Sequence, residues 1–220
     1  MRTLNFLAAA ALAMTAGLAQ AGTVIIDDFS AAQGPISDTT VNGTAVVSTL
    51  GNRTISTNML SSTTPPVSNT VAVTGGATGI LDITNGGGDD SEVILTWALS
   101  AFSFPAGATN FKFSSLILQS DGNPTEVEFL LGSTSLLSSS IDGNTINKVV
   151  GFSIDPALIA AGGNLTLKIN GAAGWDLSMD NFAVTFDDAV TPPSVPEPAT
   201  LGLLGLAMAG AAAARRRKAR

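Results

Sequence analysis

The sequence predicts an all-β fold, a jelly-roll-like β-sandwich with one short helical turn. We expect an N-terminal signal peptide and a C-terminal single transmembrane helix to flank this domain. Two observations predict the sandwich over residues 22–190. Short runs rich in Thr and Val are separated there by turns of Gly, Asn and Asp. Neither a long helical period nor a repeat of about 20–50 residues appears, which argues against a solenoid or a propeller.

Ten segments have the composition and length of strands. In chain order they are Thr23–Phe29, Thr44–Leu50, Thr70–Thr74, Gly79–Thr84, Glu92–Leu99, Phe111–Gln119, Thr125–Leu131, Lys148–Ile154, Leu165–Asn170 and Trp175–Phe186. The odd positions between Glu92 and Leu99 are apolar, so Trp97 should point into the core.

The last segment predicts a β-bulge. Apolar residues occupy odd positions over 175–179 and even positions over 182–186. A phase shift at Asp180-Asn181 is needed to keep both sets on the buried face. Earlier in the chain, the single helical turn has its own signals: Asp155 as cap, Pro156 at the first helical position and Gly162 as the left-handed exit.

The N-terminus is typical of an export signal, residues 1–21. A short basic start precedes an apolar run, Leu4 to Leu18. Ala19 and Ala21 then form the small-x-small pattern that signal peptidase accepts, so we expect cleavage after Ala21. The alternative is a buried N-terminal helix.

The C-terminus has three parts: a proline-rich spacer (191–198), an uncharged apolar run (199–214) and a basic tail (215–220). A helix over the apolar run would be about 24 Å long, and can span a core of about 30 Å if the bilayer thins locally. Clustered arginines mark the cytoplasmic side, which predicts a periplasmic domain. The charged residues of the tail are Arg215, Arg216, Arg217, Lys218 and Arg220.

These parts, with Val195, Pro196, Glu197 and Pro198 in the spacer, resemble the PEP-CTERM sorting signal of Gram-negative bacteria that make extracellular polysaccharide. The resemblance implies that exosortase, a membrane transpeptidase, processes the chain near this motif. The anchor would then be transient, and the domain would reach the cell surface or extracellular matrix. The alternative is a permanent single-span anchor, as in a surface adhesin.

Composition excludes several chemistries. The chain has no His and no Cys, so it lacks Ser-His and Cys-His nucleophiles, the usual zinc ligands and disulfides. Residues 22–195 hold sixteen acidic and four basic residues, which argues against nucleic acid and anionic membrane surfaces as partners of the domain. We therefore expect a protein that is not an enzyme and requires no cofactor.

The ends of the domain loosely resemble bacterial jelly-roll modules related to galactose-binding and carbohydrate-binding domains. The resemblance rests on Ile26-Asp27-Asp28-Phe29 and on 177–182, Leu-Ser-Met-Asp-Asn-Phe. It implies that the first and last strands pair. It also implies that Asp180, with Asp27 or Asp28, could hold a structural calcium ion through oxygen ligands. The alternative is that Asp180-Asn181 only satisfies its own backbone at the bulge.

Three functions fit these features. The first is a non-catalytic envelope or matrix protein, with extracellular polysaccharide as its partner and Trp175 as the one candidate sugar platform, although a core position is favoured for that ring. The second is a glycoside hydrolase or lyase that uses Glu126 and Glu128, which lie about 7 Å apart on one strand face. The third is adhesion through exposed strand edges. A groove beside Trp175 would favour the second.

Overall fold

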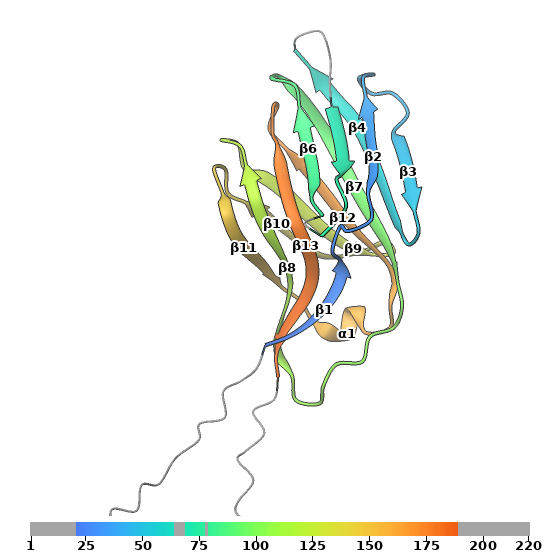
Figure 1. The fold of residues 1–220 in the computed structure, drawn as a ribbon, viewed down its shortest axis with the longest axis vertical. Helices are drawn as coiled ribbons and strands as arrows, with labels where there is room; N and C mark the ends of the chain where they lie inside the picture. The colour runs from blue at the N-terminus through green and yellow to red at the C-terminus, as the bar shows by residue number, and fades with distance from the viewer. Residues whose placement is uncertain (1–20, 64–68, 78, 189–220) are drawn as a thin grey trace, which may run out of the picture. The chain divides into compact units, whose positions relative to one another are not determined.

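The computed structural model describes residues 21–63, 69–77 and 79–188, and this part of the chain is an antiparallel β-sandwich of two sheets (Figure 1). The predicted fold class is therefore confirmed. Thirteen strands and one short helix lie within the described residues, against ten strands predicted. The three additional strands are β2, β4 and β10, which are polar on one face and carry little apolar signal.

One layer is a seven-stranded sheet in the order β11-β8-β13-β6-β5-β2, with β1 also paired to β13. Its strands are β1 (Ala21–Asp27), β2 (Gln33–Asp38), β5 (Asn69–Val73), β6 (Leu81–Asn85), β8 (Thr109–Ser120), β11 (Ile146–Ser153) and β13 (Leu177–Asp187). The other layer is a six-stranded sheet in the order β10-β9-β12-β7-β4-β3. Its strands are β3 (Val46–Leu50), β4 (Arg53–Ser62), β7 (Asp89–Leu99), β9 (Thr125–Leu131), β10 (Thr134–Ile141) and β12 (Gly163–Gly171).

The core lies between the sheets and is built by alternation along each strand. In β7 the residues Val93, Leu95 and Trp97 are all fully buried, which confirms the predicted orientation of Trp97. The ring of Trp97 packs on Phe182 of the opposite sheet, with ring centroids 4.9 Å apart. Phe182 in turn contacts Phe113 and Phe129, so aromatic rings join both layers.

The bulge predicted in the last strand is present and has a topological role. Asn181 has a φ of 55°, and the register of β13 against β8 shifts between Asp180 and Phe182. Before the bulge β13 pairs with β6, from Leu177 to Met179. After it, from Phe182 onward, β13 pairs with β1 instead. The extra residue therefore marks the point where β13 exchanges one neighbour for another.

Pairing of the first and last strands, implied by the jelly-roll resemblance, is also confirmed: Ala21 lies opposite Asp187. The helical turn is confirmed as well, as helix α1 (Pro156–Ile159). Its cap is Asp155, whose Oδ1 accepts a hydrogen bond from the Ala157 backbone N–H at 2.9 Å. Gly162 follows with a φ of 72°, the left-handed conformation expected of the exit residue.

Candidate functional site

The outer face of the six-stranded sheet carries a polar groove. In β9 the side chains of Val127 and Phe129 point into the core, which sends Glu126 and Glu128 outward. The register then brings polar residues of neighbouring strands beside them. The groove has a volume of about 180 Å³ and is lined by Glu92, Glu126, Val127, Glu128, Ser138, Lys168 and Asn170.

Cross-strand pairing sets the geometry of this groove. Glu128 lies opposite Lys168 on β12 and opposite Ser138 on β10, whereas Glu126 lies opposite Asn170. The Lys168 Nζ is 3.5 Å from Glu128 Oε2, and both side chains are about one third exposed. The groove therefore offers carboxylates, an ammonium, an amide and a hydroxyl to a ligand, the group types that recognise sugar hydroxyls by hydrogen bonding.

Glu126 and Glu128 do share one face and one groove, as the strand pattern predicts. Trp175 is not among the groove's lining residues. Glu126 is exposed, and Glu128 is half-buried beside Lys168, so neither carboxyl group has the apolar surroundings that keep a glycosidase acid protonated. The arrangement favours contact with a polar ligand over hydrolysis.

The hypothesis that Trp175 is a sugar platform is wrong. The residue is fully buried, and its Nε1–H donates to the Ser91 carbonyl at 3.1 Å. The ring occupies space beside Gly171, where a Cβ atom would lie 2.7 Å from Trp175 Cγ. Absence of a side chain at Gly171 lets the ring fold back into the core, where stacking on a ligand is excluded.

Asp27, one of the three candidate calcium ligands, has a complete set of protein donors. Arg53 Nη1 lies 2.9 and 2.8 Å from its two carboxylate oxygens. Trp97 Nε1 donates to Oδ2 at 2.7 Å, and the backbone N–H of Phe29 donates to Oδ1 at 2.8 Å. Three donor nitrogens, which make four contacts, leave this carboxylate few free lone pairs for a cation.

Asp28 and Asp180 lie in other surroundings. Asp28 accepts hydrogen bonds from Ser30, and these bonds lower the pKa of the Asp28 carboxyl below its ordinary value of 3.8. Asp180 lies opposite Leu116 on β8, and its backbone carbonyl accepts from Ser115 Oγ. Within residues 21–63, 69–77 and 79–188 no group of three acidic side chains could hold a metal ion. A calcium ion at Asp180 stays a prediction.

A larger hollow, of about 280 Å³, lies at the edge of the sandwich around the Asp27–Arg53 pair. It is lined by Ile25, Ile26, Asp27, Asp28, Ala31, Leu50, Asn52 and Arg53. Arg53 is only 3% exposed and is held by Asp27, Gln33 and the Ala31 carbonyl, so its guanidinium is already bound within the protein. This pattern is typical of a buried ion pair that stabilises the fold.

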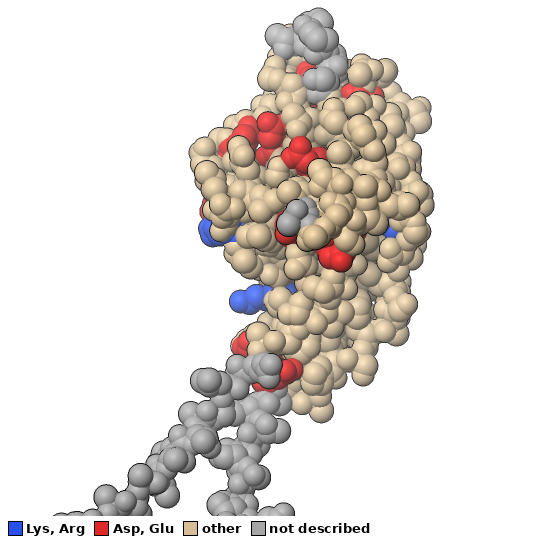
Figure 2. Space-filling view, viewed as in Figure 1, with Lys and Arg blue, Asp and Glu red and all other residues tan. Residues whose placement is uncertain are grey.

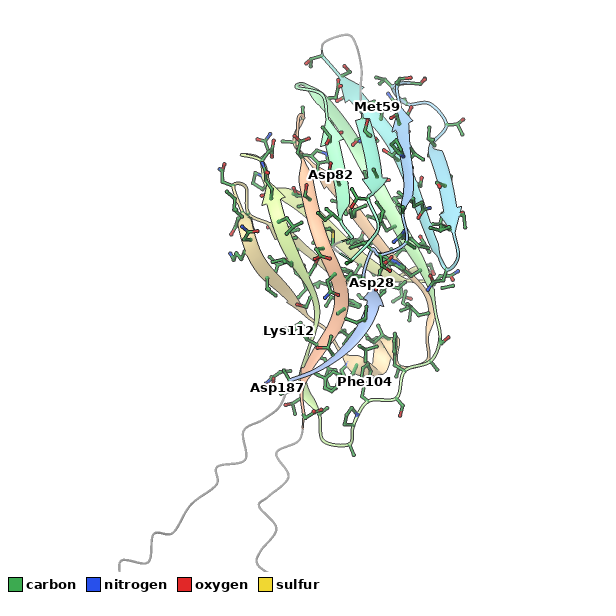
Figure 3. The ribbon with its side chains drawn as sticks, viewed as in Figure 1. Asp28, Met59, Asp82, Phe104, Lys112 and Asp187 are labelled. Carbon is green, nitrogen blue, oxygen red and sulfur yellow. The ribbon has the colours of Figure 1, made fainter. Side chains whose placement is uncertain are left out.

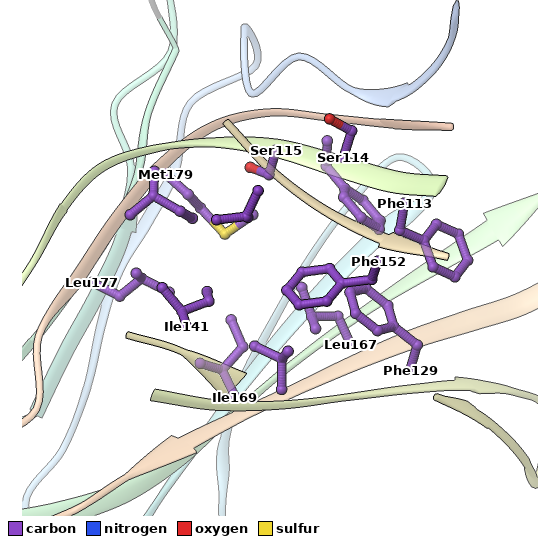
Figure 4. A pocket seen from close by; sticks show the side chains of 14 residues that line it. Phe113, Ser114, Ser115, Phe129, Ile141, Phe152, Leu167, Ile169, Leu177 and Met179 are labelled. Atoms are coloured by element: carbon purple, nitrogen blue, oxygen red, sulfur yellow. The ribbon is translucent and has the colours of Figure 1, made fainter. Parts of the chain in front are cut away.

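A third space lies inside the sandwich. Figure 4 shows aromatic and aliphatic side chains from both sheets converging on it, among them Phe113, Phe129 and Leu167. Its free volume is about 10 Å³, at the lower limit for one water molecule. It is a packing gap of the core.

Two carboxyl groups outside the groove have a raised pKa, those of Asp176 and Asp90. Burial raises the pKa of Asp176, although the Asn85 backbone N–H donates to it at 2.7 Å; Asp121 and Asp82 raise it further. Burial also raises the pKa of Asp90. Packing between distant strands buries these carboxyl groups, and the local sequence does not give that burial.

The sorting and export residues lie outside the described residues, except for Ala21, which opens β1. They are Ala19, Val195, Pro196, Glu197, Pro198, Arg215, Arg216, Arg217, Lys218 and Arg220. In the part of the chain that is described, no helix has the length and apolar character needed to cross a membrane.

Comparison with known proteins identifies the C-terminal segment. Residues 194–218 match the family model of the PEP-CTERM protein-sorting motif. The chain is thus a β-sandwich protein with a sorting motif that implies export and transient anchoring by the C-terminus. No curated protein matches it in sequence.

Among solved structures, the chain is similar to the solution structure of CtCBM11, with a TM-score of 0.39, 14% identity and coverage of 77% of this chain and 97% of the other. A family 11 carbohydrate-binding module from Clostridium thermocellum, in complex with a β-1,3-1,4-mixed-linked tetrasaccharide, gives a TM-score of 0.35 at 12% identity over the same shares. The enzymatically active domain of bacteriophage CBA120 tailspike protein 4 gives 0.36 at 14% identity, covering 61% of this chain and 19% of that one.

Proposed function

We propose that this chain is an exported, non-catalytic protein of the cell envelope or extracellular matrix, released from a transient membrane anchor by exosortase. The support is the sorting motif at residues 194–218 together with an export signal in the sequence. Signal peptidase would remove residues 1–21, and the domain would fold on the periplasmic side before transfer outward.

Mass spectrometry of the protein recovered outside the cell tests this part. The expected product begins at Gly22 and ends near Pro196-Glu197-Pro198. Recovery of a chain that retains residues 199–220 in the membrane fraction alone would favour the permanent anchor and overturn processing.

We further propose that the domain contacts polysaccharide through the groove on its six-stranded sheet. One observation carries this proposal: the groove gathers Glu126, Glu128, Lys168, Asn170 and Ser138, on three adjacent strands, around one polar hollow. Its volume of about 180 Å³ is below the range of about 300–1,000 Å³ usual for small-molecule pockets. Binding should therefore be weak per sugar and depend on repeated contacts along a polymer.

The charge of the groove selects among polymers. Three carboxylates face one ammonium there, so an acidic polysaccharide should be repelled and a neutral one accepted. No catalytic role follows for Glu126 and Glu128, because neither carboxyl group lies in apolar surroundings.

Affinity electrophoresis in gels with hydroxyethylcellulose or with alginate tests the proposal. The expected result is retardation by the neutral polymer alone, and its loss in a Lys168→Ala, Asn170→Ala double variant. Thr84→Ala, an exposed change on the seven-stranded sheet, is the matched control and should migrate as the wild type. Equal retardation of all three proteins by hydroxyethylcellulose would overturn the groove as the site.

A further inference from the structure

Both described chain ends lie at one end of the sandwich. Ala21 of β1 pairs with Asp187 of β13, and Asp187 pairs in turn with Thr109, the first residue of β8. Figure 3 shows Phe104 and Asp187 at this end, with Met59 near the other. The described residues nearest in sequence to the signal peptide and to the sorting motif therefore lie at the same end of the domain.

Two uncharged segments cover the same end. Residues 98–108 lead from β7 to β8, and residues 156–163 contain α1; neither segment holds a charged residue. The Phe102 backbone N–H donates to the Ala160 carbonyl at 2.8 Å, which joins the two. Their exposed apolar residues are Ala98, Ala101, Pro105, Ala106, Ala157, Leu158 and Ala161.

A cluster of aromatic rings packs beneath this surface. Phe104 lies 5.9 Å from Phe102, 4.9 Å from Phe111 and 5.7 Å from Phe186, measured between ring centroids. Phe102 and Phe104 are half-buried, and Leu158 is 48% exposed. The apolar side chains are thus held at the surface by packing on the core.

Both ends of the sandwich carry charged residues, but at the end with the chain termini these residues lie outside the two uncharged segments. The turns at the opposite end, beyond Ser120 of β8, carry Asp121, Asp142 and Asp176. At the end with the chain termini the charged groups are Asp155, Asp187, Asp188 and Lys112, which flank the two uncharged segments. Asp155 is the helix cap, and Asp187 accepts a hydrogen bond from Asn110 Nδ2. Figure 2 shows uncharged surface over much of the lower right of the molecule.

The length of the chain outside the described residues fixes how far this end can be from a bilayer. Ten residues, 189–198, separate Asp188 from the apolar run, a span of at most about 35 Å.

We infer that the uncharged end formed by residues 98–108 and 156–163 rests on the membrane surface while the chain is anchored, with its apolar side chains at the boundary between lipid headgroups and acyl chains. The partner is a zwitterionic lipid surface, since the acidic domain would be repelled by an anionic one. The acidic turns then point away from the bilayer. This inference rests on the proposed membrane insertion of residues 199–214.

Single cysteines test it directly, because the chain has none of its own. The full chain with Ala106→Cys, labelled with a bimane fluorophore, is reconstituted in phosphatidylcholine vesicles that contain lipids spin-labelled at shallow depth. Gly122→Cys, an exposed position in the turn that follows Ser120 at the opposite end of the sandwich, is the matched control. Ala207→Cys, inside the apolar run, reports insertion of the anchor by itself.

The expected result is strong quenching at positions 106 and 207 and little at 122. Adding Leu158→Glu to the Ala106→Cys protein should reduce quenching at position 106. The same change in the Ala207→Cys protein should leave position 207 quenched. Quenching at 207 with none at 106 would overturn the resting surface alone. Absence of quenching at 207 would instead overturn the anchor and with it the proposed function.

Replacing half of the lipid by phosphatidylglycerol should weaken quenching at 106, and an increase there would contradict the choice of lipid.

Discussion

Arg53 of β4 reaches across the sandwich to Asp27 of β1, and its Nη1 lies within 2.9 Å of both carboxylate oxygens. The two residues belong to different sheets, and both side chains are almost fully removed from water. The pair therefore fixes the first strand against the opposite layer. Removing one partner leaves a buried, uncompensated charge.

Arg53→Met should destabilise the domain by about 3–5 kcal/mol, because Asp27 loses its counter-charge in a buried place. Lys168→Gln breaks the exposed pair with Glu128 and should cost less than about 1 kcal/mol. Urea unfolding, followed by the fluorescence of Trp97 and Trp175, measures both values. Equal costs for the two variants would show that the Asp27–Arg53 pair has no special structural role.

Gly171→Ala should destabilise the domain by about 1–3 kcal/mol, since the added Cβ would meet the Trp175 ring at 2.7 Å in a packed core. Gly87→Ala is the control, because nothing lies within 4 Å of the Cβ position there. The measurement is the urea midpoint of each variant. A Gly171→Ala protein as stable as Gly87→Ala would mean that the ring can move aside freely.

Asp176 should make stability depend on pH in a definite direction. Burial raises the pKa of Asp176 in the folded protein above the ordinary 3.8, so the folded state holds this proton more tightly than the unfolded chain. The free energy of unfolding should therefore fall as the pH rises from 3.8 through the folded pKa.

Asp176→Asn should remove this fall and gain stability at neutral pH, since the amide oxygen can still accept from Asn85. Unfolding free energies of both proteins across pH 3 to 7 give the difference. Asp142→Asn, at an exposed turn, is the control for the general effect of removing one carboxylate. A difference that grows in the wild type's favour as the pH rises would contradict the assignment.

A thermal melt checks the calcium prediction for Asp180. Calcium should raise the melting temperature of the wild type relative to chelator, and should leave Asp180→Ala unchanged, because only binding to the folded state stabilises it. Overlapping melting curves for the wild type with calcium and with chelator would exclude the ion.

Glu197→Ala should leave membrane insertion intact and block processing, because the apolar run and the basic tail are untouched while the sorting motif is altered. The expected product is a membrane-retained protein about 2–3 kDa heavier than the processed form, a difference set by the length of the tail. Gel mobility and cell fractionation measure it. Release of the variant at the normal size would exclude a role for this residue.

The sequence predicts the local features of the fold well and the long-range ones poorly. The strand Thr125–Leu131 was predicted with the bounds that the structure has, and the bulge at Asp180-Asn181 was confirmed, because alternation is a local signal. The strand β4 was missed, since its inward positions include Arg53 and Thr57, which apolar patterns do not mark.

In the candidate site, too, the local features could be predicted from the sequence and the long-range ones could not. Glu126 and Glu128 could be placed on one face from spacing alone. That Lys168 and Asn170 join them depends on which strands are neighbours, and no local pattern gives that pairing. Trp175 was the one candidate sugar platform, with a core position favoured for its ring, and the core position is confirmed because Gly171 leaves room for the ring.

The place of β13 in the seven-stranded sheet has a consequence for the timing of folding. This strand pairs with β8, β6 and β1, yet it is the last strand of the domain to be synthesised. Until Leu177–Asp187 is available, β1 has no partner in the sheet and β8 and β6 have no strand between them. The seven-stranded sheet can therefore close only at the end of synthesis, and on the proposed export route only after this last strand has crossed the membrane.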